Sequence, residues 1–227
     1  MKKTFSTEAA YLFGILILAL GTALMERADF GMSMVVAPAY LLHLKLSETL
    51  PFITFGMAEY LLQAVLLVAL MVIRRRVQRG YFFSFVTAVC YGLVLDGCIL
   101  LVGLISWAGL AFRIACYLLG MVLCSLGVAL LFHTYISPEG YELFVKELSA
   151  MMGKPVSRVK TVYDCVSCGV GVLLSFVFFG FGVFEGVKLG TIFCALINGW
   201  LIGRITVFLE KRFVFADRFP LRRLFAQ

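Results

Sequence analysis

The chain has 227 residues, of which 62% are hydrophobic and only 15% are charged, and its mean hydropathy is +1.01. Soluble domains carry roughly 45–50% apolar and about 25% charged residues, so this composition excludes a soluble globular protein, a disordered chain and a disulfide scaffold. Because the apolar residues are spread along the whole chain, a soluble domain with a single anchor is excluded as well. The sequence predicts an all-α, polytopic membrane protein.

Apolar stretches long enough to cross a membrane occur six times. A spanning helix needs about 20 mostly apolar residues to cross roughly 30 Å of hydrocarbon. Residues 80–112 contain one charge and would be about 50 Å long as a single helix, so we expect a turn at residues 106–109. The expected spans are residues 9–28, 52–73, 81–104, 110–135, 161–184 and 187–209.

The net charge of +7 reflects an uneven distribution of basic residues between the spans. With the N-terminus inside, most of the 20 Lys and Arg residues fall on inner segments, as the positive-inside rule requires. We therefore expect a multi-pass protein of the bacterial cytoplasmic membrane, with both termini in the cytoplasm and a basic tail at residues 211–227. These charges attract anionic lipid of the inner leaflet, and they require no nucleic-acid partner.

The first and fourth spans resemble each other without a gap. Residues 9–25 and 115–131 share identities that include two glycines and a tyrosine, and a short non-spanning segment follows each of these spans. We infer a duplication with units at residues 1–105 and 106–210. Because each unit has three spans, the second must lie upside down, as in the inverted repeats of secondary transporters. The alternative is that helices rich in Leu, Ala and Gly resemble each other by composition alone.

The two short segments differ in character. Residues 138–152 begin with a favourable Ser-Pro pair and have an apolar face opposite Glu142, Lys146 and Glu147, so we expect an amphipathic helix in the inner interface. Residues 32–44 are more apolar and too short to span. We expect them to be re-entrant, packed within protein, or interfacial.

Several short motifs resemble those of the YitT/YczE-type bacterial membrane proteins. They are the stretches at residues 21–24, 28–33, 54–60 and 190–199. The likeness extends over nearly the whole membrane region, although the longer YitT-type members have a soluble C-terminal domain that this sequence does not contain. The resemblance implies an integral membrane protein with a transport role, and it supplies neither a substrate nor a catalytic residue.

Polar and ionisable residues inside the spans are the candidates for a binding site, because a charge in hydrocarbon costs a few kcal/mol. We expect Glu59, Gln63, Asp96, Asn198 and Arg204 to face one polar cavity between the two units. A carboxylate in such a cavity can take up a proton near neutral pH and so couple proton movement to substrate binding. The alternative is a structural ion pair between Arg204 and one of the two carboxylates.

Three further residues are secondary candidates. Asp164 opens the fifth span, while Arg27 and His133 lie at the ends of the first and fourth spans. His133 is a candidate proton carrier, and the alternative is an ordinary interfacial histidine. Asp164 and Arg204 have the alternative of reaching out to the membrane surface.

The seven cysteines indicate neither a disulfide framework nor a metal site. Cys165 and Cys168 are spaced as C-x-x-C, but they lie in an apolar span and no second pair accompanies them, so packing is the expected role. The sequence also contains no nucleophile elbow, phosphate-binding loop or metal cluster. We therefore expect no cofactor, no metal and no enzymatic activity.

The leading functional hypothesis is a small secondary transporter or permease for an unidentified small solute or ion. Small permeases often form homodimers, and the glycine-rich faces of the first and fourth spans fit packing within one chain or against a second subunit. Two alternatives stay open. One is a substrate-capture subunit of a larger transport complex, and the other is a non-transporting membrane factor that assists or regulates a partner protein.

Overall fold

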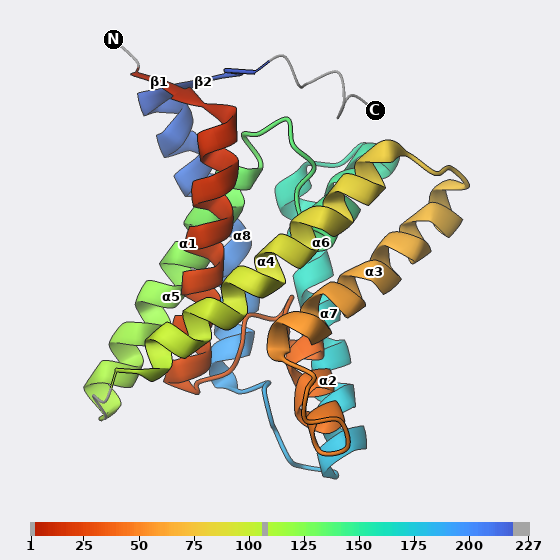
Figure 1. Ribbon diagram of the computed structural model, residues 1–227, viewed down its shortest axis with the longest axis vertical. Coiled ribbons are helices and arrows are strands. Elements are labelled where there is room, and N and C mark those ends of the chain that lie inside the picture. Colours follow the sequence, from red (N-terminus) through yellow and green to blue (C-terminus); the bar gives the residue numbers. More distant parts are fainter. Residues whose placement is uncertain (1–2, 106–108, 220–227) are drawn as a thin grey trace.

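The computed structural model describes residues 3–105 and 109–219, which form eight helices and two short strands (Figure 1). Six of the helices are long and apolar enough to cross a membrane, which confirms the all-α, polytopic fold. Most of the turn expected at residues 106–109, and the tail from residue 220, lie outside the described residues. In chain order the elements are β1 (Lys3–Ser6), α1 (Thr7–Ala28), α2 (Ala37–Ser47), α3 (Phe55–Arg74), α4 (Arg79–Gly103), α5 (Leu110–Leu131), α6 (Gly140–Met152), α7 (Val156–Phe179), α8 (Leu189–Arg212) and β2 (Phe213–Ala216).

The ends of the spans differ from the hydropathy pattern where local backbone chemistry decides them. Helix α3 begins at Phe55 rather than residue 52, because the Thr54 hydroxyl caps it by accepting from the Met57 amide at 3.1 Å. Helix α7 ends at Phe179, and the next residue, Gly180, has φ 101°, a left-handed conformation that favours glycine. Helix α5 ends at Leu131, four residues earlier than expected.

Helices α1 and α5 pack antiparallel against each other (Figure 1), and they are the most buried of the six candidate spans. A Cβ atom on Gly14 would lie 3.2 Å from the carbonyl oxygen of Gly127, and one on Gly21 would lie 2.8 Å from that of Gly120. In the alignment of the two spans, Gly14 corresponds to Gly120 and Gly21 to Gly127. A two-fold axis that superimposes one unit on the other therefore maps the Gly14–Gly127 contact onto the Gly21–Gly120 contact. The two contacts are thus related by the symmetry of an inverted repeat.

The other helix–helix contacts show the same two-fold relation between the units. Helix α1 packs against α4 as α5 packs against α8, and α3 packs against α4 as α7 packs against α8. Each short helix packs against the second span of the opposite unit, α2 against α7 and α6 against α3. The fold is thus two inverted, interlocked three-span units with one short helix each.

Both short helices begin in the interior. Residues 32–39, which lead into α2, are all buried, and so are residues 137–143 at the start of α6. The far end of α6 is exposed at Met151 and Met152. In one respect α6 differs from the expected interfacial helix: Glu142 and Glu147 face the protein rather than water, because each lies beside a basic side chain of another helix.

Strands β1 and β2 pair in parallel, with Lys3 opposite Phe213 and Ser6 opposite Ala216. The pairing brings the two ends of the described chain together at one end of the helix bundle (Figure 1). Glu8 strengthens the junction by accepting from the backbone amides of Arg218 and Phe219. Residues 3–6 and 213–219 therefore lie at the same end of the helix bundle.

A bulkier residue at the centre of the α1–α5 contact should force the units apart. A Cβ atom on Gly21 would lie 2.7 Å from the Cys124 amide nitrogen, so we expect Gly21→Val to lower the free energy of unfolding by about 1–3 kcal/mol. Thermal unfolding in detergent measures the loss. Gly97→Val is the matched control, because a Cβ atom there meets nothing within 4 Å. Equal midpoints for the two variants would contradict the tight α1–α5 contact.

Candidate functional site

A small buried cavity, called here the central cavity, lies where α2 and α6 begin. Its volume is about 30 Å³, which is roughly the volume of one water molecule. Helices α1 and α4 of the first unit and α5, α7 and α8 of the second all contribute to its walls. Its polar lining residues are Thr22, Ser33, Tyr91, Cys124, Glu139, Tyr141, Glu142, Lys160 and Asn198.

Lys160 is the buried cation of this cavity, and within the described chain it is the one Lys or Arg side chain that is buried. Its Nζ atom lies 3.4 Å from Glu142 Oε1 and 3.3 Å from Asp164 Oδ1, and the three side chains are 2%, 4% and 0% exposed, respectively. A buried charge is tolerated only when it is paired, so these two carboxylates are what holds an ammonium at this depth.

Two residues of α3 hold the start of α6 beside the cavity. Gln63 donates from Nε2 to Glu139 Oε2 at 3.2 Å and accepts at Oε1 from the Gly140 amide at 2.8 Å. One turn earlier, Glu59 accepts at Oε2 from the Tyr141 hydroxyl at 2.9 Å. Glu59 and Gln63 are i and i+4 on one helix face, and both are completely buried.

Two carboxylate oxygens of the cavity have no hydrogen-bond partner in the described part of the chain. They are Glu139 Oε1 and Glu142 Oε2, both fully shielded from solvent. Burial and the nearby carboxyl groups of Glu142 and Glu59 raise the pKa of Glu139 well above its ordinary value. These oxygens are free to bind a proton or a ligand within the cavity.

The charges around the cavity do not balance if every carboxyl group is ionised. Four buried carboxyl groups, on Glu59, Glu139, Glu142 and Asp164, face one buried cation, Lys160. The N-termini of α2 and α6 add the equivalent of about half a positive charge each. About two negative charges remain to be neutralised by protons or by a bound cation.

The structure brings together four of the residues that the sequence singled out. Asn198 lines the cavity and accepts at Oδ1 from the Ser125 hydroxyl at 2.9 Å. Asp164 pairs with Lys160, and Glu59 and Gln63 adjoin the cavity through their hydrogen bonds to the start of α6.

Sequence reasoning missed the three charged residues that line the cavity itself, Glu139, Glu142 and Lys160. All three lie outside the spans that hydropathy delimits. A usable signal was the spacing of Lys160 and Asp164, because an i, i+4 ion pair at the start of an apolar helix lies on one face.

Asp96 and Arg204, which the sequence placed in the same cavity, lie elsewhere. Asp96 accepts from the Thr54 hydroxyl at 2.7 Å and from the Gly56 amide at 2.9 Å, so it anchors the start of α3. Arg204 is exposed, with its guanidinium 5.7 Å from the ring centroid of Trp200. The predicted grouping of both residues with Glu59 is therefore wrong: each lies within the length of a span but does not face the cavity.

The secondary candidates Arg27 and His133 stabilise the ends of their helices. Arg27 donates to the carbonyl of Ile105 at 3.0 Å. His133 lies with Nδ1 2.6 Å from the carbonyl oxygen of Ala129 and Nε2 3.5 Å from Glu210 Oε1. Neither residue lines the central cavity.

Larger cavities lie toward each end of the bundle. One of about 160 Å³ lies between α5, α7 and α8 on the side of the two strands, and Lys160 lines both it and the central cavity. Another of about 310 Å³ lies toward the opposite end, where Glu26, His43 and Asp96 line it. The central cavity thus lies between these two larger cavities, and Lys160 lies at its boundary with one of them.

The chain belongs to a family of unknown function, DUF6198, whose family model matches residues 5–207. No curated protein and no solved structure matches the chain. The family match covers both short helices and nearly all of the six spans, including every residue of the central cavity.

Proposed function

We propose, for this member of a family without an assigned activity, a small secondary transporter that binds a small solute or ion at the central cavity. The observation that carries the proposal is that two short helices, one from each inverted unit, begin at the same buried, carboxylate-rich cavity. Interrupted helices that meet near the middle of the membrane form the substrate and ion sites of many secondary transporters.

The inverted units supply a route for alternating access. One larger cavity lies on each side of the central cavity. In this proposal each is an entrance, and Lys160 with its two carboxylates is the barrier on the side of the strands. When inverted units exchange conformations, the barrier moves to the opposite side. In that state the residues of the first unit that correspond to this cluster close the opposite entrance.

The coupling ion in this proposal is the proton. Glu139 and Glu142 each have a buried oxygen without a hydrogen-bond partner in the described chain, and the surrounding positive charge does not neutralise all the carboxyl groups. A proton neutralises a carboxylate and, unlike a metal cation, takes up almost no volume in so small a cavity. Substrate binding and proton uptake are thereby linked at one place.

We place the strand-bearing end of the bundle in the cytoplasm of a bacterial cell. The segments that join α3 to α4 and α6 to α7 lie at this end (Figure 1). Arg75, Arg76 and Lys154 lie on these segments, and Arg74 and Arg158 lie in the adjoining helix turns. The positive-inside rule supports this orientation. The motifs shared with the YitT/YczE-type proteins support a distant relationship to that group, whose members are also membrane proteins.

Two measurements on the purified full chain test the proposal. A thermal-shift screen against metabolites, vitamins and inorganic ions, at one pH below and one above neutrality, is expected to find a stabilising solute. In proteoliposomes, uptake of that solute is then expected to require an imposed pH gradient.

The alternatives give different results in the same experiments. Stabilisation without uptake, together with co-purification of ATPase subunits, would indicate a substrate-capture subunit. No stabilisation, no uptake and full tolerance of alanine at Glu59 and Glu139 would indicate a non-transporting factor.

A further inference from the structure

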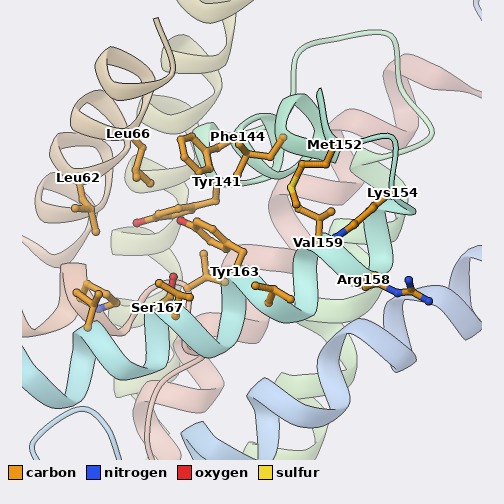
Figure 2. A pocket seen from close by; sticks show the side chains of 16 residues that line it. Leu62, Leu66, Tyr141, Phe144, Met152, Lys154, Arg158, Val159, Tyr163 and Ser167 are labelled. Carbon is orange, nitrogen blue, oxygen red and sulfur yellow. The ribbon is translucent and has the colours of Figure 1, made fainter. Parts of the chain in front are cut away.

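An apolar groove runs along the outside of α6, between α3 and α7 (Figure 2). Its volume is about 460 Å³, within the roughly 300–1,000 Å³ of small-molecule sites. The walls include Leu62 and Leu66 from α3, Phe144 from α6, and Val162 and Val166 from α7. The two valines are 60% and 59% exposed, so the groove opens sideways to the lipid.

The length of the groove matches one leaflet of a bilayer. Along α7 its lining extends from Arg158 to Val170, which is about 18 Å at 1.5 Å per residue. Half of the hydrocarbon core is about 15 Å thick. The groove therefore runs from the membrane surface, at the strand-bearing end, to about the middle of the membrane.

Two basic side chains, Lys154 and Arg158, lie at the surface end of the groove (Figure 2). Both are exposed, and neither has an ion-pair partner within the described chain. The nearby carboxylate of Glu147 is already paired with Arg74, with Oε2 2.9 Å from Nε. The entrance of an otherwise apolar groove thus carries two unbalanced positive charges.

We propose that the groove binds an acyl chain of an anionic phospholipid, with the lipid phosphate held by Lys154 and Arg158. Arginine and lysine are the side chains that bind phosphate best, the first through a planar fork and the second as a compact charge. The apolar length of the groove accommodates the chain, and the charged entrance selects the headgroup. This proposal is independent of the transported solute.

The bound lipid also covers the side of the protein where the groove would otherwise expose its inner wall to the membrane. Tyr141 from α6 and Tyr163 from α7 both line the groove (Figure 2). Tyr141 lines both the groove and the central cavity, and its hydroxyl donates to Glu59. An acyl chain against these rings separates the carboxylates from the membrane and holds α6 between α3 and α7.

Lipid binding is measured on the full chain in detergent, by native mass spectrometry and thermal unfolding. We expect phosphatidylglycerol to bind at least tenfold more tightly than phosphatidylcholine and to raise the unfolding midpoint further. Inorganic phosphate alone should leave the midpoint unchanged. Equal binding of the two lipids, or a full shift with inorganic phosphate, would overturn the proposal.

Variants separate the groove from general surface charge. Changing Lys154 and Arg158 together to alanine is expected to remove the tenfold preference, whereas the same change at Lys211 and Arg212, which do not line the groove, should leave it intact. Val166→Trp fills the groove and should weaken the binding of both lipids. Retention of the preference by the first double variant, or of tight binding by Val166→Trp, would refute the site.

Discussion

Replacing Lys160 by methionine is expected to lower the free energy of unfolding by about 3–5 kcal/mol at neutral pH. Lys160 is buried and pairs with Glu142 and Asp164, at 3.4 and 3.3 Å. Methionine fills a similar volume but leaves two buried carboxylates without their cation.

Unfolding of the detergent-solubilised protein by heat or denaturant measures this loss. Lys146→Met is the matched control, because Lys146 is exposed on α6 and surface changes usually shift stability by less than about 0.5 kcal/mol. Adding Glu142→Gln and Asp164→Asn to Lys160→Met should restore most of the stability. If Lys160→Met unfolds like Lys146→Met, the buried cluster does not hold the central cavity together.

Hydropathy predicts the number of spans well because burial in hydrocarbon depends on the average of many residues. It fails at helix ends, where single residues decide. The Thr54 cap delays the start of α3, and glycines in left-handed conformations follow the end of α7. The four-residue strands β1 and β2 are too short to show a pattern, and their pairing joins segments some 210 residues apart.

From the sequence, a residue of the candidate site could be predicted only where it is a polar residue inside an apolar span. Glu59 and Gln63 are polar within an apolar span, which makes them visible in the sequence. Glu139, Glu142 and Lys160 lie in segments that hydropathy places outside the spans, and they become buried because the chain re-enters the protein there. Re-entry depends on tertiary packing, because each short helix packs on a span of the opposite unit.

Depth in the membrane also does not determine which way a side chain points. Asp96 lies well inside its span, yet it binds the start of α3 because Gly56 and Gly92 let α3 and α4 approach closely. A Cβ atom on Gly56 would clash with the Gly92 carbonyl oxygen, and the close approach brings the Gly56 amide to 2.9 Å from Asp96. The close packing of α3 on α4 at these two glycines cannot be read from a single sequence.

Replacing Glu139 by glutamine is expected to reduce uptake driven by a pH gradient at least about 100-fold, while substrate exchange without a gradient continues. Glutamine keeps an acceptor for the Gln63 amide, which lies 3.2 Å from Glu139 Oε2, but it cannot carry a proton. Glu59→Gln should behave in the same way, because Glu59 shares this buried network. Membrane insertion should be unaffected in both variants.

The pH dependence of stability gives a second measurement of the same group. Because the pKa of Glu139 is raised in the folded protein, its contribution to stability is fully present below the unfolded pKa of about 4.3. That contribution is lost as the pH rises through the folded pKa. Wild-type protein should therefore lose more stability than Glu139→Gln on going to alkaline pH.

Glu147→Gln is the matched control for both measurements, because Glu147 is also buried on α6 but pairs with Arg74 and does not line the cavity. It should retain gradient-driven uptake and the wild-type pH dependence. If Glu139→Gln changes neither quantity relative to this control, the coupling proton is not bound at Glu139. If only stability responds, the raised pKa is a structural consequence of burial, and the proton must be carried by another carboxyl group.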